Sequence, residues 1–439
     1  MAQHKNRSEF IHAFLAIIGG LFVVTALSGC SSGGGASSGP SKPSVSGQYA
    51  FWPMPPADPH MQFLQPIASR EDVSPDRRSA LSALVFGEED RQQSAIEKPY
   101  GVDMKDGRLY VCDIRKNTVV VLDFEKKQMR LMGATGFNAL ANPVDVEVAD
   151  DGMIYVADNE RRAVFVFDAK EKFKMVIGHD DFRPVGVVTF GDRLYVCNLD
   201  LQIVEIFNRF TGELIGSIGE VGDEDGQFRV PLGIDVDTEG NVYVIDLMRC
   251  RLQKFSPDGQ LLAAVGTSGD APGSFVRPKH IAVDTDGIIY IVDAAFQNVQ
   301  MFDHEFRLLM HFGAGGDFTG AMNLPAGICV DDTSLKYFVD ELHPGFDAKR
   351  LVLVTNQFGF SKVGAYAMGE RAEGWSISEL TANAADVEAG LGANPETMRL
   401  QTQTGELPPE EPAQEQPAAT PDESGDAADG EGDGEEPNS

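Results

Sequence analysis

Five side chains of this 439-residue chain combine the types and spacing needed to hold a metal ion. Asp103, Glu147 and Asp235 each stand four residues after a proline, whereas Asp145 and His280 each stand two residues after one. Calcium is the ion that this set favours, because Ca²⁺ takes about six to eight oxygen ligands and prefers carboxylates. The alternative is that these acids line a hydrated channel or accept hydrogen bonds from neighbouring backbone amides, as most buried polar groups do.

The elements that would position these residues belong to a repeat. Six times, a proline is followed after 11 or 12 residues by a tyrosine and three residues later by Asp or Asn. The prolines are Pro99, Pro143, Pro184, Pro231, Pro278 and Pro325; the tyrosines are Tyr110, Tyr155, Tyr195, Tyr243, Tyr290 and Tyr337; the acids or amides are Asp113, Asp158, Asn198, Asp246, Asp293 and Asp340. A period of 40 to 48 residues indicates an array of like units.

Each unit has the pattern of four short strands separated by turn residues. In the fourth unit these are Gly233–Asp237, Val242–Asp246, Arg251–Phe255 and Leu261–Val265. Four-stranded units of this length that repeat radially form propeller blades. The sequence therefore predicts an all-β fold, a six-bladed β-propeller with four-stranded antiparallel blades.

A closed ring requires one blade to be completed from the other end of the chain. Leu81–Phe86 occupies the position of an outermost strand but precedes the first unit. We therefore expect this N-terminal strand to pair into the blade that begins at Pro325, which would remove exposed sheet edges. That last blade also carries an insertion at His343–Asp347.

The innermost strands of a propeller border its axis, so the five candidate ligands should face a central channel. Six-fold geometry places Asp145, from blade two, across the axis from His280, from blade five. No nucleophile elbow, His-Glu-x-x-His pattern, phosphate loop or dinucleotide fingerprint is present in the sequence, so no other catalytic motif competes with this constellation.

The repeats resemble the NHL family of six-bladed propellers. The similarity is carried by Tyr155–Asp158, Gly233–Asp237 and Val299–Phe302, and the lead-in Phe51–Pro56 is similar to that of bacterial envelope lipoproteins with this propeller. The resemblance implies a non-catalytic binding protein. The chain departs from the family pattern at Asn198, where an Asp is usual, and in its expanded sixth blade.

The N-terminus predicts export and lipidation. Lys5 and Arg7 precede an apolar run, Phe14–Ala26, that is shorter than the roughly 20 residues needed to span a membrane. The ending Leu-Ser-Gly-Cys is similar to the bacterial lipobox, which implies cleavage before Cys30 and palmitate-type acylation of that residue. Ser31 after the cysteine favours the outer membrane by the same resemblance. The alternative is an ordinary cleaved signal that leaves a free protein.

The other four cysteines, Cys112, Cys197, Cys250 and Cys329, show no Cys-x-x-Cys spacing, which argues against a zinc site. Cys112 and Cys197 occupy equivalent places in blades one and three, with a blade between them, and this separation argues against a disulfide between them. We expect four buried thiols that pack as small apolar side chains.

Net charge is −31, and residues 401–439 contribute 12 acids and no Lys or Arg. Such a segment cannot bury a core and is predicted to be disordered. A phosphate backbone requires Lys and Arg, so nucleic acid is excluded as a partner. The predicted organisation is a signal peptide (1–29), a flexible tether (30–50), a lead-in with the closing strand (51–98), the propeller (99–370), a short helical extension (371–400) and the acidic tail (401–439).

Three functions remain open on these grounds. The favoured one is a monomeric, membrane-anchored scaffold without catalysis that recognises an envelope protein or peptide, with loops such as Asp223–Gly226 and the insertion around Phe346 as candidate contacts. The alternative is a metal-dependent propeller enzyme of the lactonase or amidating-lyase kind. The third is a structural link between membrane and wall through the tail.

Overall fold

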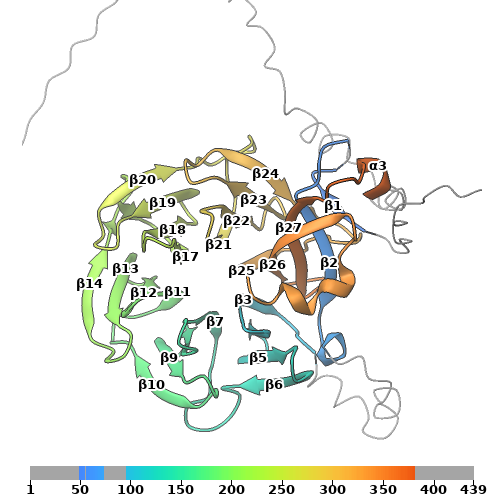
Figure 1. Cartoon of the computed structure of the whole chain (residues 1–439). Coiled ribbons are helices and arrows are strands. Elements are labelled where there is room, and N and C mark those ends of the chain that lie inside the picture. Colours follow the sequence, from blue (N-terminus) through green and yellow to red (C-terminus); the bar gives the residue numbers. More distant parts are fainter. Residues whose placement is uncertain (1–48, 55, 74–94, 381–439) are drawn as a thin grey trace, which may run out of the picture. The chain divides into compact units, whose positions relative to one another are not determined.

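The computed structural model describes residues 49–54, 56–73 and 95–380. These residues form six antiparallel sheets arranged around an axis, as Figure 1 shows. The predicted class, an all-β six-bladed propeller, is confirmed. Within the described ranges, no helix is long and apolar enough to cross a membrane.

The first five blades each contain four strands, ordered from the axis outwards as they occur in the chain. Blade one contains β3 (Pro99–Lys105), β4 (Arg108–Asp113), β5 (Thr118–Asp123) and β6 (Gln128–Met132); blade two contains β7 (Pro143–Val148), β8 (Ile154–Asp158), β9 (Ala163–Phe167) and β10 (Phe173–Ile177); blade three contains β11 (Pro184–Phe190), β12 (Arg193–Asn198), β13 (Ile203–Asn208) and β14 (Leu214–Ile218). Blade four contains β17 (Pro231–Val236), β18 (Val242–Asp246), β19 (Arg251–Phe255) and β20 (Leu261–Val265); blade five contains β21 (Pro278–Val283), β22 (Ile289–Asp293), β23 (Asn298–Phe302) and β24 (Leu308–Phe312).

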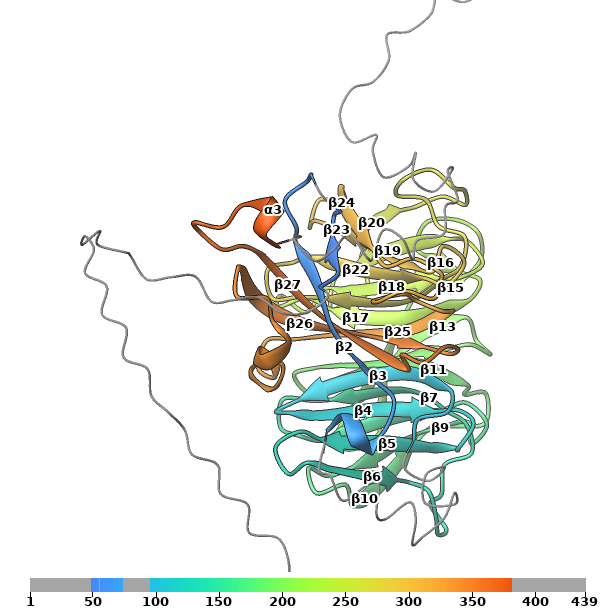
Figure 2. The same ribbon diagram turned by 90° about the vertical axis from the view of Figure 1, so that its right-hand side faces the viewer.

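Blade six joins the two ends of the described chain. Its strands from the axis outwards are β25 (Pro325–Asp331), β26 (Phe346–Asn356), β27 (Val363–Arg371), β2 (Met61–Ile67) and β1 (Phe51–Trp52). Strand β2 pairs antiparallel with β27, with Met61 opposite Met368. Figure 2 shows this N-terminal strand, in blue, beside the C-terminal strands in orange.

Closure by an N-terminal strand is therefore confirmed, but its assignment to Leu81–Phe86 is wrong. The place next to β27 is taken by Met61–Ile67, and Leu81–Phe86 lies outside the described residues. The segment that closes the ring is buried on both faces from Met61 to Leu64, and the rings of Phe63 and Tyr366 pack edge-on with their centres 5.2 Å apart. Gly87 lies 12 residues before Pro99, as Gly219 does before Pro231, and this spacing favoured Leu81–Phe86 as the closing strand.

The repeated Tyr and Asp or Asn positions, which we call the repeat column, were also assigned wrongly in the sixth unit. Tyr337 ends the short 3-10 helix η2 (Leu335–Tyr337) and Asp340 lies in η3 (Val339–Glu341), both within an insertion before β26. The equivalent positions are Leu353, which pairs with Cys329, and Asn356, whose Oδ1 accepts a hydrogen bond from Asn323 N at 3.0 Å. Because of the insertion, Leu353 and Asn356 lie 16 residues further along the chain than the spacing of the other units predicts. Tyr337 and Asp340 stand at the predicted spacing by coincidence.

The Asp or Asn of the repeat column holds the loops next to its blade in place through hydrogen bonds. The Asp293 carboxylate, for example, accepts hydrogen bonds from the backbone N–H groups of Val276 and Arg277 before the blade and of Ala295 and Phe296 after β22. Burying a carboxylate is favourable only when such donors satisfy it. This requirement explains why an Asp or Asn stands at the same place in each unit.

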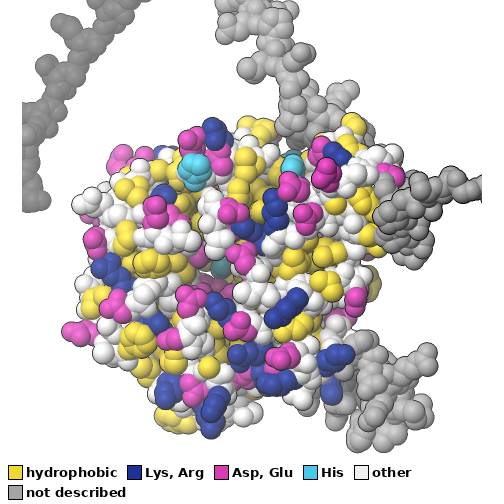
Figure 3. All heavy atoms as spheres, viewed as in Figure 1, with side chains coloured by type: hydrophobic (Ala, Val, Ile, Leu, Met, Phe, Trp, Pro, Cys, Tyr) yellow, Lys and Arg dark blue, Asp and Glu magenta, His cyan; other side chains and the backbone are white. Residues whose placement is uncertain are grey.

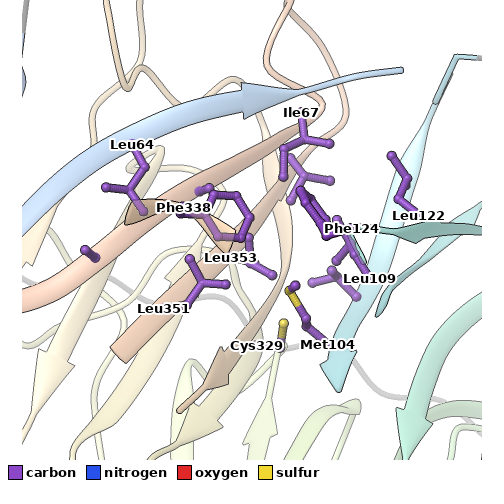
Figure 4. Packing of buried hydrophobic residues seen from close by; sticks show 14 of the residues in the cluster. Leu64, Ile67, Met104, Leu109, Leu122, Phe124, Cys329, Phe338, Leu351 and Leu353 are labelled. Carbon is purple, nitrogen blue, oxygen red and sulfur yellow. The ribbon is translucent and has the colours of Figure 1, made fainter. Parts of the chain in front are cut away.

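The hydrophobic core lies between neighbouring blades. One cluster, drawn in Figure 4, joins β2 and blade six to blade one through Leu64, Leu109, Phe124, Phe338 and Leu353. The tyrosines of the first five units are almost fully buried in these contacts. Cys112, Cys197, Cys250 and Cys329 are buried free thiols, as predicted.

Besides η2 and η3, four short elements of the described residues lie outside the regular blades. They are the 3-10 helix η1 (Arg70–Asp72), the helix α3 (Ile377–Leu380), and the parallel pair β15 (Glu220–Val221) and β16 (Gln227–Phe228) in the connection between blades three and four.

Candidate functional site

Strand direction gives the propeller two different faces. Every innermost strand begins at its proline, so the connections between blades and those between second and third strands lie together on what we call the proline face: residues 95–98, 114–117, 133–142, 159–162, 178–183, 199–202, 219–230, 247–250, 266–277, 294–297, 313–324 and 357–362. The remaining connections lie on the opposite side, which we call the channel face.

A cavity of about 590 Å³ lies on the axis. Its wall includes the ends of the innermost strands and the turns that follow them, such as Asp150, Gly191, Thr285 and Asp332, so it opens on the channel face. Figure 3 views this face and shows the hollow at its centre, with acidic and histidine side chains inside. All five predicted ligand residues, Asp103, Glu147, Asp235, Asp145 and His280, line this cavity.

Asp145 and His280 meet across the axis, as predicted. His280 Nε2 lies 3.2 Å from Asp145 Oδ1, and their side chains are only 11% and 3% exposed, respectively. Four of the six blades have glycine at this position, namely Gly101, Gly186, Gly233 and Gly327. The neighbouring backbones approach closely there, because a Cβ on Gly186 would overlap the carbonyl oxygen of Leu232. The pair therefore closes the axis beneath the cavity.

The other three acids link neighbouring blades. Asp103 Oδ2 accepts a hydrogen bond from Val148 N at 2.7 Å, and Asp235 Oδ2 accepts one from Val283 N at 2.6 Å. Glu147 Oε1 accepts from Thr189 Oγ1 at 2.6 Å. In each case the donor belongs to the next blade, so these acids follow the predicted alternative, in which carboxylates pair with nearby backbone amides.

Burial and mutual repulsion raise the pKa values of these three acids. Burial raises the pKa of Glu147 to about 7 against the hydrogen bond from Thr189, with the charge of Asp235 adding to the rise. Burial also raises the pKa of Asp235 to about 7. The pKa of Asp103 is held well above its usual value by burial and by the charge of Glu147. A cluster of raised carboxyl pKa values is characteristic of functional sites, although structural networks also produce it.

His280 is shifted towards its charged form. Burial lowers the pKa of His280, but the negative charge of Asp145 and the hydrogen bond to it outweigh burial and raise the pKa above its usual value. The Nδ1 atom of His280 is buried and has no hydrogen-bond partner. The pair thus has the character of a buried ion pair that closes a blind cavity.

The five residues share one cavity but do not form a calcium cage. Within the described part of the chain, no three His, Cys, Asp or Glu side chains are grouped closely enough to hold a metal ion. Asp103 and Asp235 each accept backbone N–H groups on both oxygens, whereas Ca²⁺ needs about six to eight oxygens directed at one point. The donor set does not fit the ion.

A buried charged group beside the cavity, paired with the lining residues Asp284 and Asp332, was not expected from the sequence. The Arg350 guanidinium pairs with Asp284, with Asp286 at 2.7 Å and with Asp332 at 3.4 Å. Tyr290, from the repeat column, donates its hydroxyl proton to Asp284 Oδ2 at 2.9 Å. Arg350 lies just after the insertion of blade six. An alignment of the repeats that matched Leu353 to the tyrosines of the other units would have identified Arg350 as a residue of β26 near the cavity.

The proline face carries most of the large exposed apolar side chains of the described loops. Among described residues, the large apolar side chains that are exposed in the loops of this face are Phe137, Leu201, Val221, Met248, Val276, Phe358 and Phe360, compared with Phe210 and Val339 on the channel face. The remaining exposed ones lie on the outermost strands. Phe346, at the centre of the insertion expected to contribute to recognition, is 5% exposed and packs against Phe51, so its own side chain is not available for a contact.

No sequence model of a known protein family matches the chain, and no curated protein matches it either. Solved structures with a similar fold include a streptogramin B lyase (12% identity, TM-score 0.45, over 62% of this chain and 94% of that one) and a protein of unknown function from Bacteroides thetaiotaomicron (16%, 0.47, 63% and 70%). A gluconolactonase from Xanthomonas campestris is similar at 14% identity and a TM-score of 0.45, over 62% of this chain and 86% of that one. At these values the likeness concerns the fold alone. Membership of the NHL family stays a prediction.

Proposed function

We propose that the chain is a membrane-anchored, non-catalytic lipoprotein whose proline face recognises another envelope protein or peptide. The observation that carries this proposal is the concentration of exposed apolar side chains in the loops of one face. Phe137 is 95% exposed, Phe360 87% and Met248 70%. Exposed apolar side chains that gather in one region, rather than singly, mark interaction sites.

The residue types are those that contribute most to protein interfaces. Aromatic residues and Met are enriched in interfaces, and a few such anchors usually supply most of the binding energy. The chain has Phe137, Met248, Phe358 and Phe360 in loops of three different blades. A partner in contact with several blades would be held in one orientation.

These loops are held in place before binding. Met248 N donates to Asp246 Oδ1 at 3.1 Å, so the loop that carries Met248 is fixed by the buried acid of its own blade. The loop of Phe358 is tied to the preceding connection through Phe358 N, which donates to Asn323 O at 3.2 Å. Loops ordered in advance lose less entropy on binding.

The proposed anchor is Cys30. It lies outside the described residues, as do the signal segment and most of the Ser, Gly and Pro tether, so support comes from the sequence pattern. Several acyl chains on one residue hold a protein on a membrane, at about 0.8 kcal/mol per buried CH₂. A Cys30→Ser chain should move from the membrane fraction to the soluble fraction.

Comparative purification of face variants tests the recognition. Full-length lipidated chain is crosslinked in cells, purified in detergent, and its co-purifying proteins are quantified by mass spectrometry. We expect specific partners to fall by about tenfold or more in a Phe137→Ser, Met248→Ser, Phe360→Ser chain, because anchors of this kind each contribute more than about 1 kcal/mol. A Phe210→Ser, Val339→Ser chain, altered on the channel face, is the control. Equal amounts of co-purifying partner from the parent chain, the proline-face variant and the channel-face variant would refute the proposal.

The alternative is a metal-dependent propeller enzyme. Its support is the blind cavity with carboxyl groups of raised pKa. It lacks a grouped set of metal ligands in the described residues, so the geometry favours recognition. Metal analysis of the purified chain together with a panel of lactone substrates separates the two functions.

A further inference from the structure

Three basic side chains lie where the innermost strands of blades one and five begin, at the axis on the proline face. Lys98 precedes Pro99 of β3, whereas Arg277 and Lys279 flank Pro278 of β21. Lys279 Nζ lies 5.4 Å from the centre of the Tyr100 ring, so blades one and five meet here. We call Lys98, Arg277 and Lys279 the basic cluster. Lys98 and Lys279 are partly exposed and Arg277 is exposed.

The basic cluster has no acidic partner among the described residues. Other cations of this face are paired, as Arg115 is with Glu97 at 3.2 Å and Arg183 with Asp200 at 2.7 Å. None of the ion pairs in the described ranges involves Lys98, Arg277 or Lys279. The nearby carboxylate of Asp293 is fully buried and already accepts four backbone N–H groups.

Electrostatics indicate that the positive charge is uncompensated. Burial lowers the pKa of Lys279 to about 8, and repulsion from Arg277 and Lys98 contributes to the lowering. An anion placed between the three side chains would relieve this repulsion. Such a cluster is unusual in a chain whose net charge is −31.

We propose that the basic cluster binds carboxylates of the chain's own segment 401–439. That segment has 12 acids and no Lys or Arg, so its charge is complementary to the cluster. Its covalent attachment gives it an effective concentration that a separate acidic partner would have to exceed, in the millimolar range for short linkers. The 20 residues between Leu380 and Gln401 span at most about 70 Å when fully extended.

This inference does not rest on the proposed envelope partner. Bound at the axis, segment 401–439 would lie on the same face as Met248 and Phe360. It would therefore compete with a partner for part of that surface, and the two proposals can succeed or fail separately.

Carbodiimide crosslinking of the full-length chain at low salt tests the contact. The reagent joins a lysine amine to a carboxylate only when the two groups touch. We expect Lys98 and Lys279 to be joined to Asp or Glu residues beyond Gln401 within one chain. A mixture of ¹⁵N-labelled and unlabelled chains distinguishes links within a chain from links between chains. Lys349, which pairs with Glu370 at 3.0 Å, reports random contact.

Arg277→Gln is the decisive variant, because it removes one charge of the cluster and leaves both amines. We expect the yield of these links to fall about fivefold, measured relative to acetylation of the same two amines by a neutral reagent. Arg115→Gln, which removes another exposed arginine of the same face, should leave the yield unchanged. Unchanged yield in Arg277→Gln, links found only between chains, or equal linkage of Lys349 would overturn the proposal.

Discussion

Asp145 and His280 stand where the other four blades have glycine, and their side chains fill the axis that glycine would leave open. Asp145 is satisfied on both oxygens, since Oδ2 also accepts a hydrogen bond from Val187 N at 2.9 Å. One carboxylate thus links blade two to its neighbour and to the opposite blade. Its removal would leave a buried amide and a buried histidine without partners.

Asp145→Ala should therefore destabilise the propeller by about 2–4 kcal/mol, the usual cost of breaking a buried charged pair from one side. Asp150→Ala is the matched control, because Asp150 pairs with Lys105 on the exposed surface and such pairs contribute about 0–1 kcal/mol. Urea unfolding of both variants measures the difference. Similar stabilities for the two variants would contradict the role given to Asp145.

Stability should fall as pH rises through neutrality. The pKa of Glu147 is about 7 in the folded chain and about 4.5 in an unfolded one, so the folded state holds more protons between these values. Its contribution is fully present below about pH 4.5 and is lost as pH rises through about 7. It amounts to about 3 kcal/mol, from 1.36 kcal/mol per pKa unit. Asp235 and His280, whose pKa values are also raised, act in the same direction.

The measurement is the free energy of unfolding between pH 5 and pH 8. We expect the decline with pH to be smaller in Glu147→Gln than in the parent chain, and unaffected in Glu213→Gln, which alters an exposed residue. A pH profile of Glu147→Gln that parallels the parent profile would show that Glu147 does not titrate as proposed.

Counting from the prolines sufficed to predict that Asp145 and His280 face one another, because strand register and six-fold geometry determine that relation. The partners of Asp103, Glu147 and Asp235 could not be predicted in the same way. Each donor lies on a neighbouring blade, and its distance depends on how closely the two innermost strands pack. The same composition was compatible with a calcium site until those backbone amides were located.

At the scale of strands, close approach near the axis depends on residues without a side chain. Gly186 in β11 is the clearest case, since a Cβ there would overlap the Leu232 carbonyl oxygen at the start of β17. Backbone atoms cannot move aside as a flexible side chain can. The innermost strands of blades three and four would have to separate.

Gly186→Ala should consequently destabilise the fold by about 1–3 kcal/mol, the usual cost of overpacking a core. Gly269→Ala is the control, because a Cβ there would lie 3.6 Å from Ser274 Oγ, at ordinary contact distance. Thermal unfolding of the two variants compares them. Equal melting temperatures would show that the innermost strands are less tightly packed than described.

Blade six shows the limit of repeat counting at this scale. Spacing predicted five blades in register, and failed in the sixth, where the insertion before β26 carries a tyrosine and an acid at the expected interval. Local pattern could not reject Tyr337 and Asp340. The pairing of Pro325 with Asn356 is a long-range contact, and only the paired strands reveal it.

At the scale of the whole molecule, closure of the ring holds both faces together. The cavity wall and the loops of the proline face are contributed by all six blades, so their geometry depends on blade six retaining its N-terminal strand. Sequence reasoning correctly required such a strand, because an open propeller would expose a sheet edge. It assigned this strand to Leu81–Phe86, because the choice of Met61–Ile67 depends on side-chain packing such as Phe63 against Tyr366.

Hydrogen exchange of the backbone amides of Met61–Ile67 tests this closure most directly. If β2 is an integral strand of blade six, amides that pair with β27 should exchange as slowly as those of β27 itself, through global unfolding. Exchange of Met61–Ile67 within seconds, while blades one to five stay protected, would show that this strand does not close the ring.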